Sequence, residues 1–121
     1  MAASATITIT GTVTGTPTGS TTFSNTITSA AANSTVVQTV LQSGANTITL
    51  PTLPAPSGCV IKLPATNTAV VTLKGVTGDT GIAIGKTSTI VLNWDSTALP
   101  TSFVLTSAST QTGLITEIKY F

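Results

Sequence analysis

Hydroxyl and apolar side chains alternate strictly along the first part of the chain. From Thr6 to Thr18 every even position is Thr, while the odd positions between them are Ile, Val, Gly or Pro. A period of two places alternate side chains on opposite faces of an extended strand. Fully extended at about 3.3 Å per residue, the segment would reach roughly 40 Å, about twice the length of an ordinary strand. It therefore predicts either a folded-back hairpin or an arm that leaves its own domain.

We favour the arm over the hairpin. A hairpin would break the segment at Gly11 and Gly15, but these glycines and Pro17 leave few side chains for a private core. Thr21–Thr28 continues as a second extended run with fewer apolar positions. We therefore predict an extended, Thr-rich N-terminal arm over residues 1–30 that pairs with a neighbouring molecule. The residues expected to make this assembly contact are Thr6, Ile7, Thr8, Ile9, Thr10, Thr12, Val13 and Thr14.

Residues 31–121 contain short β-branched apolar runs that are separated by Gly, Pro, Ser, Asn and Asp. Such runs with turn residues between them are typical of strands in a sheet. The predicted strands are Thr35–Leu41, Asn46–Leu50, Cys59–Leu63, Ala69–Lys74, Gly81–Ile84, Thr89–Trp94, Phe103–Ser107 and Leu114–Tyr120. Eight short strands without a helical period predict an all-β domain, an antiparallel β-sandwich similar to a jelly roll.

The composition of the chain argues against some classes of binding partner. Only 6% of the residues are charged and the formal net charge is +1, against about 25% charged in an ordinary soluble domain. Thr, Ser, Asn and Gln must therefore cover the surface, and a nearly uncharged surface favours association between copies. The chain has four lysines and no Arg, which argues against nucleic acid because several phosphate-neutralising contacts would be needed.

No apolar run approaches the roughly 18 to 20 residues that would span a bilayer. The start, Met1 to Ala5, lacks the positive and apolar regions of a signal peptide. We therefore expect a protein that is made in a cytoplasm and has no membrane partner.

The residues for catalysis are almost absent. There is no His, one Cys and three carboxylates far apart in sequence, so neither a Ser-His-Asp arrangement nor a His-based metal site can form within one chain. Cys59 is expected to be a small buried hydrophobe at a strand start, and Asp79 a turn residue. A calcium site at Asp79 or Asp95 would need carbonyls or a neighbouring copy to complete it. We predict no enzyme, no catalytic residue, no metal and no cofactor.

Gly81 to Thr87 has some likeness to a phosphate-binding loop, but the spacing between its glycines is one residue short and a strand follows it. We therefore interpret it as a turn. Trp94 could serve as a platform for sugar stacking, although a single Trp at a sheet rim is more often a core or subunit residue. Together with Tyr120 and Phe121 it is our candidate for a subunit contact.

The C-terminal third carries a resemblance to a known class. Lys74–Ile82 is followed by the Ile90–Leu92 run, then Thr101–Leu105, then Gly113–Ile118. This succession resembles small virion proteins of tailed bacteriophages. The resemblance implies a β-sandwich or jelly roll that decorates or cements a capsid in the virion, often as a homotrimer, with the major capsid protein or another virion protein as its partner. Alternatives are a phage tail or fibre component, or an ice-binding or carbohydrate-binding module that uses the Thr face or Trp94.

Overall fold

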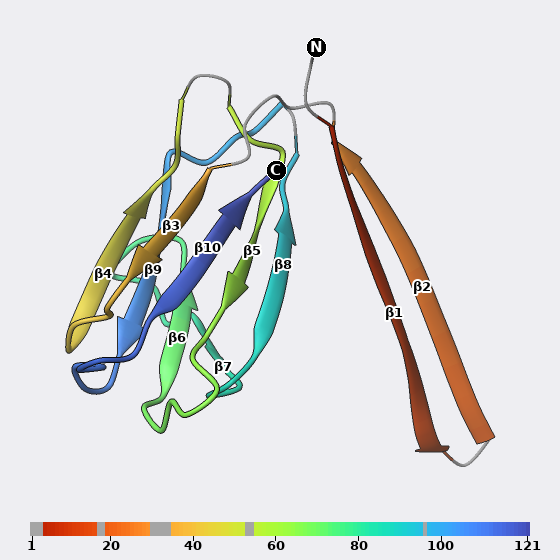
Figure 1. Cartoon of the computed structure of the whole chain (residues 1–121), viewed down its shortest axis with the longest axis horizontal. Helices are drawn as coiled ribbons and strands as arrows, with labels where there is room; N and C mark the ends of the chain where they lie inside the picture. The colour runs from red at the N-terminus through yellow and green to blue at the C-terminus, as the bar shows by residue number, and fades with distance from the viewer. Residues whose placement is uncertain (1–3, 17–18, 30–34, 53–54, 96) are drawn as a thin grey trace.

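The computed structural model describes residues 4–16, 19–29, 35–52, 55–95 and 97–121. These residues form ten strands and no helix, and every pairing between the strands is antiparallel. The strands make three sheets, one of two strands and two of four strands (Figure 1). The all-β, antiparallel prediction is therefore confirmed, while the total number of strands is larger than the eight predicted.

The two additional strands are at the N-terminus, where β1 (Ala5–Thr16) pairs with β2 (Gly19–Ser29). The register runs from Ala5 opposite Ser29 to Val13 opposite Thr21, and it shifts between Val13 and Thr16. The hairpin thus replaces the single extended arm that the alternation favoured. Residues 17–18 lie outside the described residues, and β1 runs through both Gly11 and Gly15, so neither glycine ends the strand. Both runs alternate with the same period, so the antiparallel register from Ala5 to Val13 places like side chains on the same face of the hairpin.

The other two sheets form a sandwich. Its strands are β3 (Val36–Thr39), β4 (Gly44–Thr49), β5 (Gly58–Lys62), β6 (Val71–Lys74), β7 (Ile82–Ile84), β8 (Thr89–Asn93), β9 (Ser102–Ser107) and β10 (Thr116–Tyr120). One sheet has the order β3-β10-β5-β8 and the other has the order β4-β9-β6-β7. Each strand overlaps one of the eight ranges predicted from the sequence. The boundary predicted between arm and domain falls within residues 30–34, outside the described residues.

The core lies between the two four-stranded sheets. Along β10, buried Thr116, Ile118 and Tyr120 alternate with Glu117 and Lys119, which point to the other face. The same alternation in the other strands builds a cluster of buried residues: Leu41, Ile48, Leu50, Cys59, Ile61, Leu63, Val71, Phe103, Leu105, Ile118 and Tyr120. Full burial of one such aliphatic side chain stabilises a fold by about 1.5 to 3 kcal/mol. All members of this cluster belong to the sandwich, so the hairpin contributes none of it.

Buried polar side chains join three loops at one end of the sandwich. Gln111 Nε2 donates to Asn67 Oδ1 at 2.9 Å, and Thr116 Oγ1 donates to Gln111 Oε1 at 3.3 Å. Asn67 Nδ2 donates to the carbonyls of Ala69 and Lys86. Because buried polar groups need partners, this cluster holds the loops around Asn67, Lys86 and Gln111 in one arrangement.

Candidate functional site

The hairpin presents two chemically different faces. Residues directly opposite each other in an antiparallel pair share a face, so the register gathers the even positions of β1 and β2 on one side. This hydroxyl face is exposed and consists of Thr6, Thr8, Thr10, Thr12, Thr22, Ser24, Thr26 and Thr28. Five of the residues predicted for the assembly arm, Thr6, Thr8, Thr10, Thr12 and the less regularly paired Thr14, are exposed hydroxyl residues of β1.

The opposite side of the hairpin is its apolar face, which we define as Ile7, Ile9, Val13, Phe23 and Ile27. Val13 and Phe23 are each 51% exposed. The ring of Phe23 lies against its partner Gly11 and leaves no room there for a Cβ. Gly11 is therefore a contact site for an aromatic ring rather than a strand break, as cross-strand aromatic cover of a glycine would require.

The hairpin stands beside the sandwich and joins it only near its base (Figure 1). The Oγ atoms of Ser29 and Ser57 share a hydrogen bond of 2.9 Å, and Ser29 is buried. Among the described strands, β1 and β2 pair with each other alone. Residues 1–61 contain no Asp, Glu, Lys or Arg, so the hairpin carries no charged side chain.

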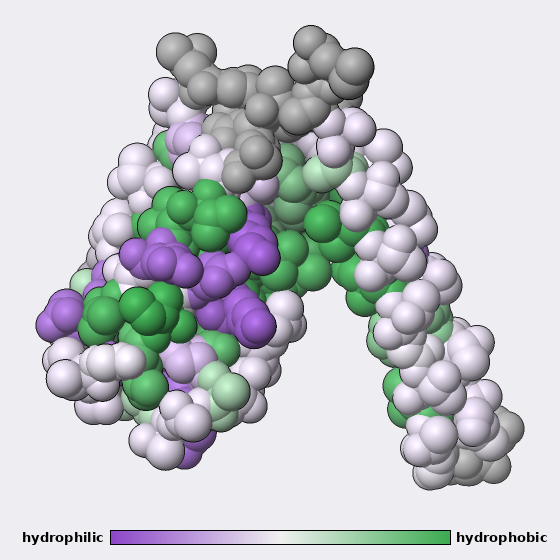
Figure 2. All heavy atoms as spheres, viewed as in Figure 1, coloured by the Kyte–Doolittle hydropathy of each residue, from purple (hydrophilic) through white to green (hydrophobic). Residues whose placement is uncertain are grey.

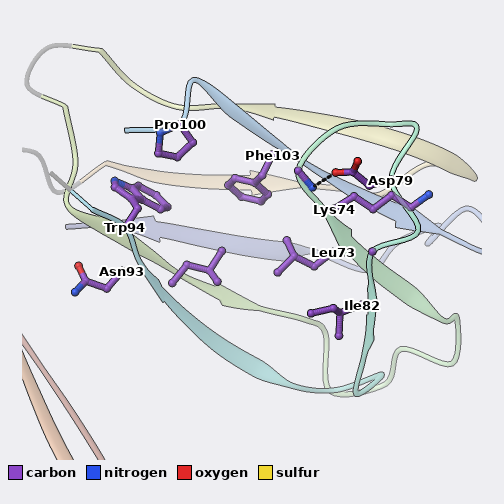
Figure 3. Close-up of a pocket in the computed structure, with 11 residues that line it drawn as sticks. Leu73, Lys74, Asp79, Ile82, Asn93, Trp94, Pro100 and Phe103 are labelled. Atoms are coloured by element: carbon purple, nitrogen blue, oxygen red, sulfur yellow. Dashed lines mark hydrogen bonds between the residues drawn. The ribbon is translucent and has the colours of Figure 1, made fainter. Parts of the chain in front are cut away.

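A groove opens between the two layers of the sandwich on the side of β7 and β8 (Figure 3). Its volume is about 450 Å³, and its walls are mainly apolar. We define this edge groove by Leu73, Ile82, Leu92, Trp94, Pro100 and Phe103. In Figure 3, Trp94 and Phe103 point into the space between the layers, whereas Asn93 points away. The short strand β7 leaves Ile82 71% exposed, so this edge of the sandwich is not closed.

Trp94 anchors one end of the edge groove. Its indole Nε1 donates to the carbonyl of Pro56 at 2.7 Å, and its ring packs partly buried against the core. This packing supports the core interpretation of Trp94, and a role as a sugar platform stays a prediction. Tyr120 and Phe121 are 3% and 4% exposed within this chain. They leave little side-chain surface for a partner, and a subunit contact through them stays a prediction.

The carboxylates are engaged in local contacts. Asp79 Oδ2 accepts from the amides of Gly75 and Val76, which confirms the turn prediction. Asp95 Oδ1 accepts from the amide and hydroxyl of Thr97, and these bonds lower the pKa of Asp95. Among the described residues no group of three or more His, Cys, Asp and Glu side chains could hold a metal ion.

Glu117 and Lys119 form an ion pair at 3.1 Å on one face of β10. The hydrogen bond from Lys119 lowers the pKa of Glu117. Both side chains remain partly exposed, so solvent screens their attraction and the pair adds little to stability. The pair lies on the solvent-facing side of the sheet, where Glu117 also lines a shallow pocket of about 310 Å³ with Gln38 and Lys62.

Two titratable groups are buried in the core. Burial raises the pKa of the Cys59 thiol to about 12, so the thiol stays protonated and unreactive at neutral pH. The prediction that Cys59 is a buried hydrophobe at a strand start is confirmed, since it is the second residue of β5 and is 0% exposed. Burial also raises the pKa of Tyr120 to about 12, and its hydroxyl has no hydrogen-bond partner among the described residues.

Sequence reasoning missed the edge groove. Leu73, Ile82 and Leu92 look like ordinary inward positions of their strands, and only the adjacency of the β7 and β8 edges exposes them together. The signal that could have found it is the short Ile82–Ile84 run, which is too small to cover a sheet edge.

Within the described part of the chain, there is no helix with the length and apolarity needed to cross a membrane. No family model, curated protein or solved structure matches the chain.

Proposed function

We propose that this chain is a structural virion protein that decorates or cements a bacteriophage capsid, bound through its N-terminal hairpin and through contacts between copies. The observation that carries the proposal is the hairpin itself, which stands outside a sandwich that has its own complete core. A two-stranded hairpin is at best marginally stable alone in water. A partner that covers it would supply the missing stabilisation.

The strand order of the sandwich supports a jelly-roll arrangement. Successive strands cross between the two sheets at every step except β6 to β7, and β3 lies next to β10 in its sheet. Two interleaved four-stranded sheets of this kind are the architecture of jelly rolls, which viral capsid proteins and lectins use. The same order would also suit a phage tail or fibre component, which differs from a decoration protein in its location on the particle.

The hairpin offers two ways to hold a neighbour. The outer edges of β1 and β2 are free, within the described strands, to pair with a strand of the major capsid protein or another virion protein. The apolar face can pack against a second surface at the same time. An exposed edge of this length invites unwanted association unless it is paired, which fits a protein whose working state is an assembly, with a homotrimer as the stoichiometry we expect.

The test compares the whole chain with a chain that lacks residues 1–28, using particles purified from cells that produce the protein. We expect both chains to fold, because the core cluster contains no residue before Leu41, and only the whole chain to sediment with the particles. Cryo-electron microscopy of the decorated particles would separate capsid from tail. Equal sedimentation of the two chains would refute the role of the hairpin, and particles that bind neither chain would refute the virion proposal.

A second candidate function rests on the hydroxyl face. Thr6 with Thr28, Thr8 with Thr26 and Thr12 with Thr22 form opposite pairs in register, which is the regular array that an ice-binding surface would require. Thermal hysteresis of the purified chain tests this candidate, with Thr8→Lys as a variant of the face and Ile9→Lys as its matched control. Absence of hysteresis in the unmodified chain excludes it.

A further inference from the structure

We infer that the edge groove of the sandwich receives the apolar face of the hairpin from a second copy of this chain. The inference rests on the proposed role of the hairpin as a binding arm, and it names a copy of the chain as what this arm binds. The two apolar surfaces involved are those defined above, on the hairpin and between β7 and β8.

The edge of the sandwich that would receive the hairpin is open. In the described strands, β8 pairs with β5 alone and β7 pairs with β6 alone, so both sheets end at this side of the sandwich. Between these edges lies a space of about 450 Å³ that is lined mainly by apolar side chains, with Ile82 exposed at its rim. An apolar groove with a few polar groups at its rim is typical of a site that receives apolar groups of a binding partner. The occupant must therefore bring apolar side chains and strand edges.

The hairpin brings both an apolar face and strand edges, and it does not bury its apolar face against its own sandwich. Figure 2 shows hydrophobic atoms on both sides of the open space that separates the hairpin from the sandwich. Phe23 and Val13 remain half exposed. Because the hairpin of one copy stands away from its own groove, a second copy can bury its apolar face.

The surface area that the hairpin can bury in the groove bears on which partner it binds. At about 3.3 Å per residue and 4.8 Å between strands, the paired part of the hairpin offers a face of roughly 300 Å². The edge that receives it is shorter, because β8 has five residues and extends only about 16 Å, so one seated hairpin removes roughly 300 Å² from water, well below the roughly 1,200 Å² of a standard stable interface. When two copies exchange hairpins, each takes part in two such contacts and the buried area doubles to about 600 Å², which is the size of a weak interface. Exchange between copies therefore buries more surface than a single contact, and we expect a weak, concentration-dependent association.

The charges do not oppose this association. The hairpin belongs to the uncharged first part of the chain. At the groove, Asp79 is held by the amides of Gly75 and Val76, and Lys74 is the other charged residue of the lining. No like charges are brought together when the apolar face enters the groove.

The test measures the mass of the whole chain by sedimentation velocity over a wide concentration range, without particles. Four variants form two matched pairs that place the same charge on opposite faces of one strand. Ile9→Lys changes the apolar face and Thr8→Lys the hydroxyl face, while Ile82→Lys changes the groove and Ala83→Lys the residue beside it. Circular dichroism checks that each variant folds. We expect association of the unmodified chain, weakened about tenfold or more by Ile9→Lys and by Ile82→Lys, and unchanged by the two controls.

Disulfide trapping shows whether the hairpin in the groove comes from the same chain or from a second copy. An Ile9→Cys chain and an Ile82→Cys chain are mixed and oxidised, with Cys59 buried and unreactive in both. We expect a disulfide between the two different chains. A double variant that forms the bond within one chain at every dilution would assign the groove to its own hairpin and overturn the inference.

Two further results would also overturn it: a chain that stays monomeric at all concentrations, or association that both Ile9→Lys and Ile82→Lys leave intact. A monomeric chain that still sediments with particles through residues 1–28 would leave the proposed function standing and remove only this inference. A chain that self-associates as expected but binds no particle would leave this inference standing and remove the proposed function.

Discussion

Replacing Asn67 by Ala should destabilise the sandwich by about 3 kcal/mol, because one buried amide holds three loops. Asn67 is 4% exposed, and its Nδ2 donates to the carbonyls of Lys86 at 2.6 Å and Ala69 at 3.0 Å. Its Oδ1 accepts from the amide of Ala69 at 3.0 Å and from Gln111 Nε2 at 2.9 Å. The variant removes all four hydrogen bonds.

The expected loss of stability follows from the polar groups that the variant leaves without a hydrogen-bond partner. The amide of Gln111 is 3% exposed, and leaving a buried donor without its partner costs about 1 to 3 kcal/mol. The contacts to Lys86 and Ala69 lie nearer the solvent, where each lost hydrogen bond contributes about 0.5 to 1.5 kcal/mol. The sum is a large part of the roughly 5 to 15 kcal/mol that stabilises an ordinary domain.

The assay is equilibrium unfolding in urea, followed by the fluorescence of Trp94 and by circular dichroism. With a urea slope of about 1 to 3 kcal/mol per molar, the midpoint should fall by roughly 1 to 3 M. Thr68→Ala, at the exposed neighbouring position, is the matched control and should leave the midpoint unchanged. Asn67→Asp, which keeps the size but puts a carboxylate against two carbonyls, should destabilise more at neutral than at acid pH. An Asn67→Ala chain within about 0.5 kcal/mol of the unmodified one would refute this account of the cluster.

Three more predictions concern the groove, the core and the hairpin. Trp94→Ala should lower the free energy of unfolding by about 2 to 4 kcal/mol and Trp94→Phe by about 1 kcal/mol, measured in urea by circular dichroism; a fully stable Trp94→Ala chain would contradict the core role. The pKa values of Cys59 and Tyr120 are raised in the folded chain to about 12 from ordinary values of 9.0 and 10.0. The folded chain therefore holds these protons more tightly than the unfolded chain does. The full free energy of unfolding is present below pH 9 and falls as the pH rises towards 12. Thermal unfolding measured against pH should show this fall, and Cys59→Ala should weaken it between pH 9 and pH 10. Gly11→Val should displace the ring of Phe23 and open the hairpin to limited proteolysis, while the thermal midpoint of the sandwich stays unchanged; equal protection of the hairpin in both chains would argue against the ring contact.

The eight strands of the sandwich were predictable because their signal is local. In β10 the buried residues Thr116, Ile118 and Tyr120 alternate with Glu117 and Lys119 within five positions, and a period of two defines a strand without knowledge of its neighbours. The same local pattern failed at the N-terminus. Alternation describes a lone arm and a hairpin equally well, and only the pairing of β1 with β2 separates them.

The candidate site was less predictable. Trp94 was identified from its type, and the hairpin residues from their alternation. Leu73, Ile82 and Leu92 were missed, because their shared exposure depends on strand order rather than on any one run. The buried cluster of Asn67, Gln111 and Thr116 was missed for a similar reason, since its members come from separate loops and a strand.

The amino-acid sequence by itself determined that this chain is an extended, hydroxyl-rich and nearly uncharged protein of strands and turns. Those properties depend on the identity and spacing of near neighbours. Tertiary structure alone decided which strands pair, that the first two pair with each other, and that one edge of the sandwich stays open. The reason is that pairing depends on the free energy of contacts between residues far apart in the chain, such as Ala5 with Ser29 at the hairpin and Leu73 with Leu105 in the sandwich, and a local pattern carries no information about them.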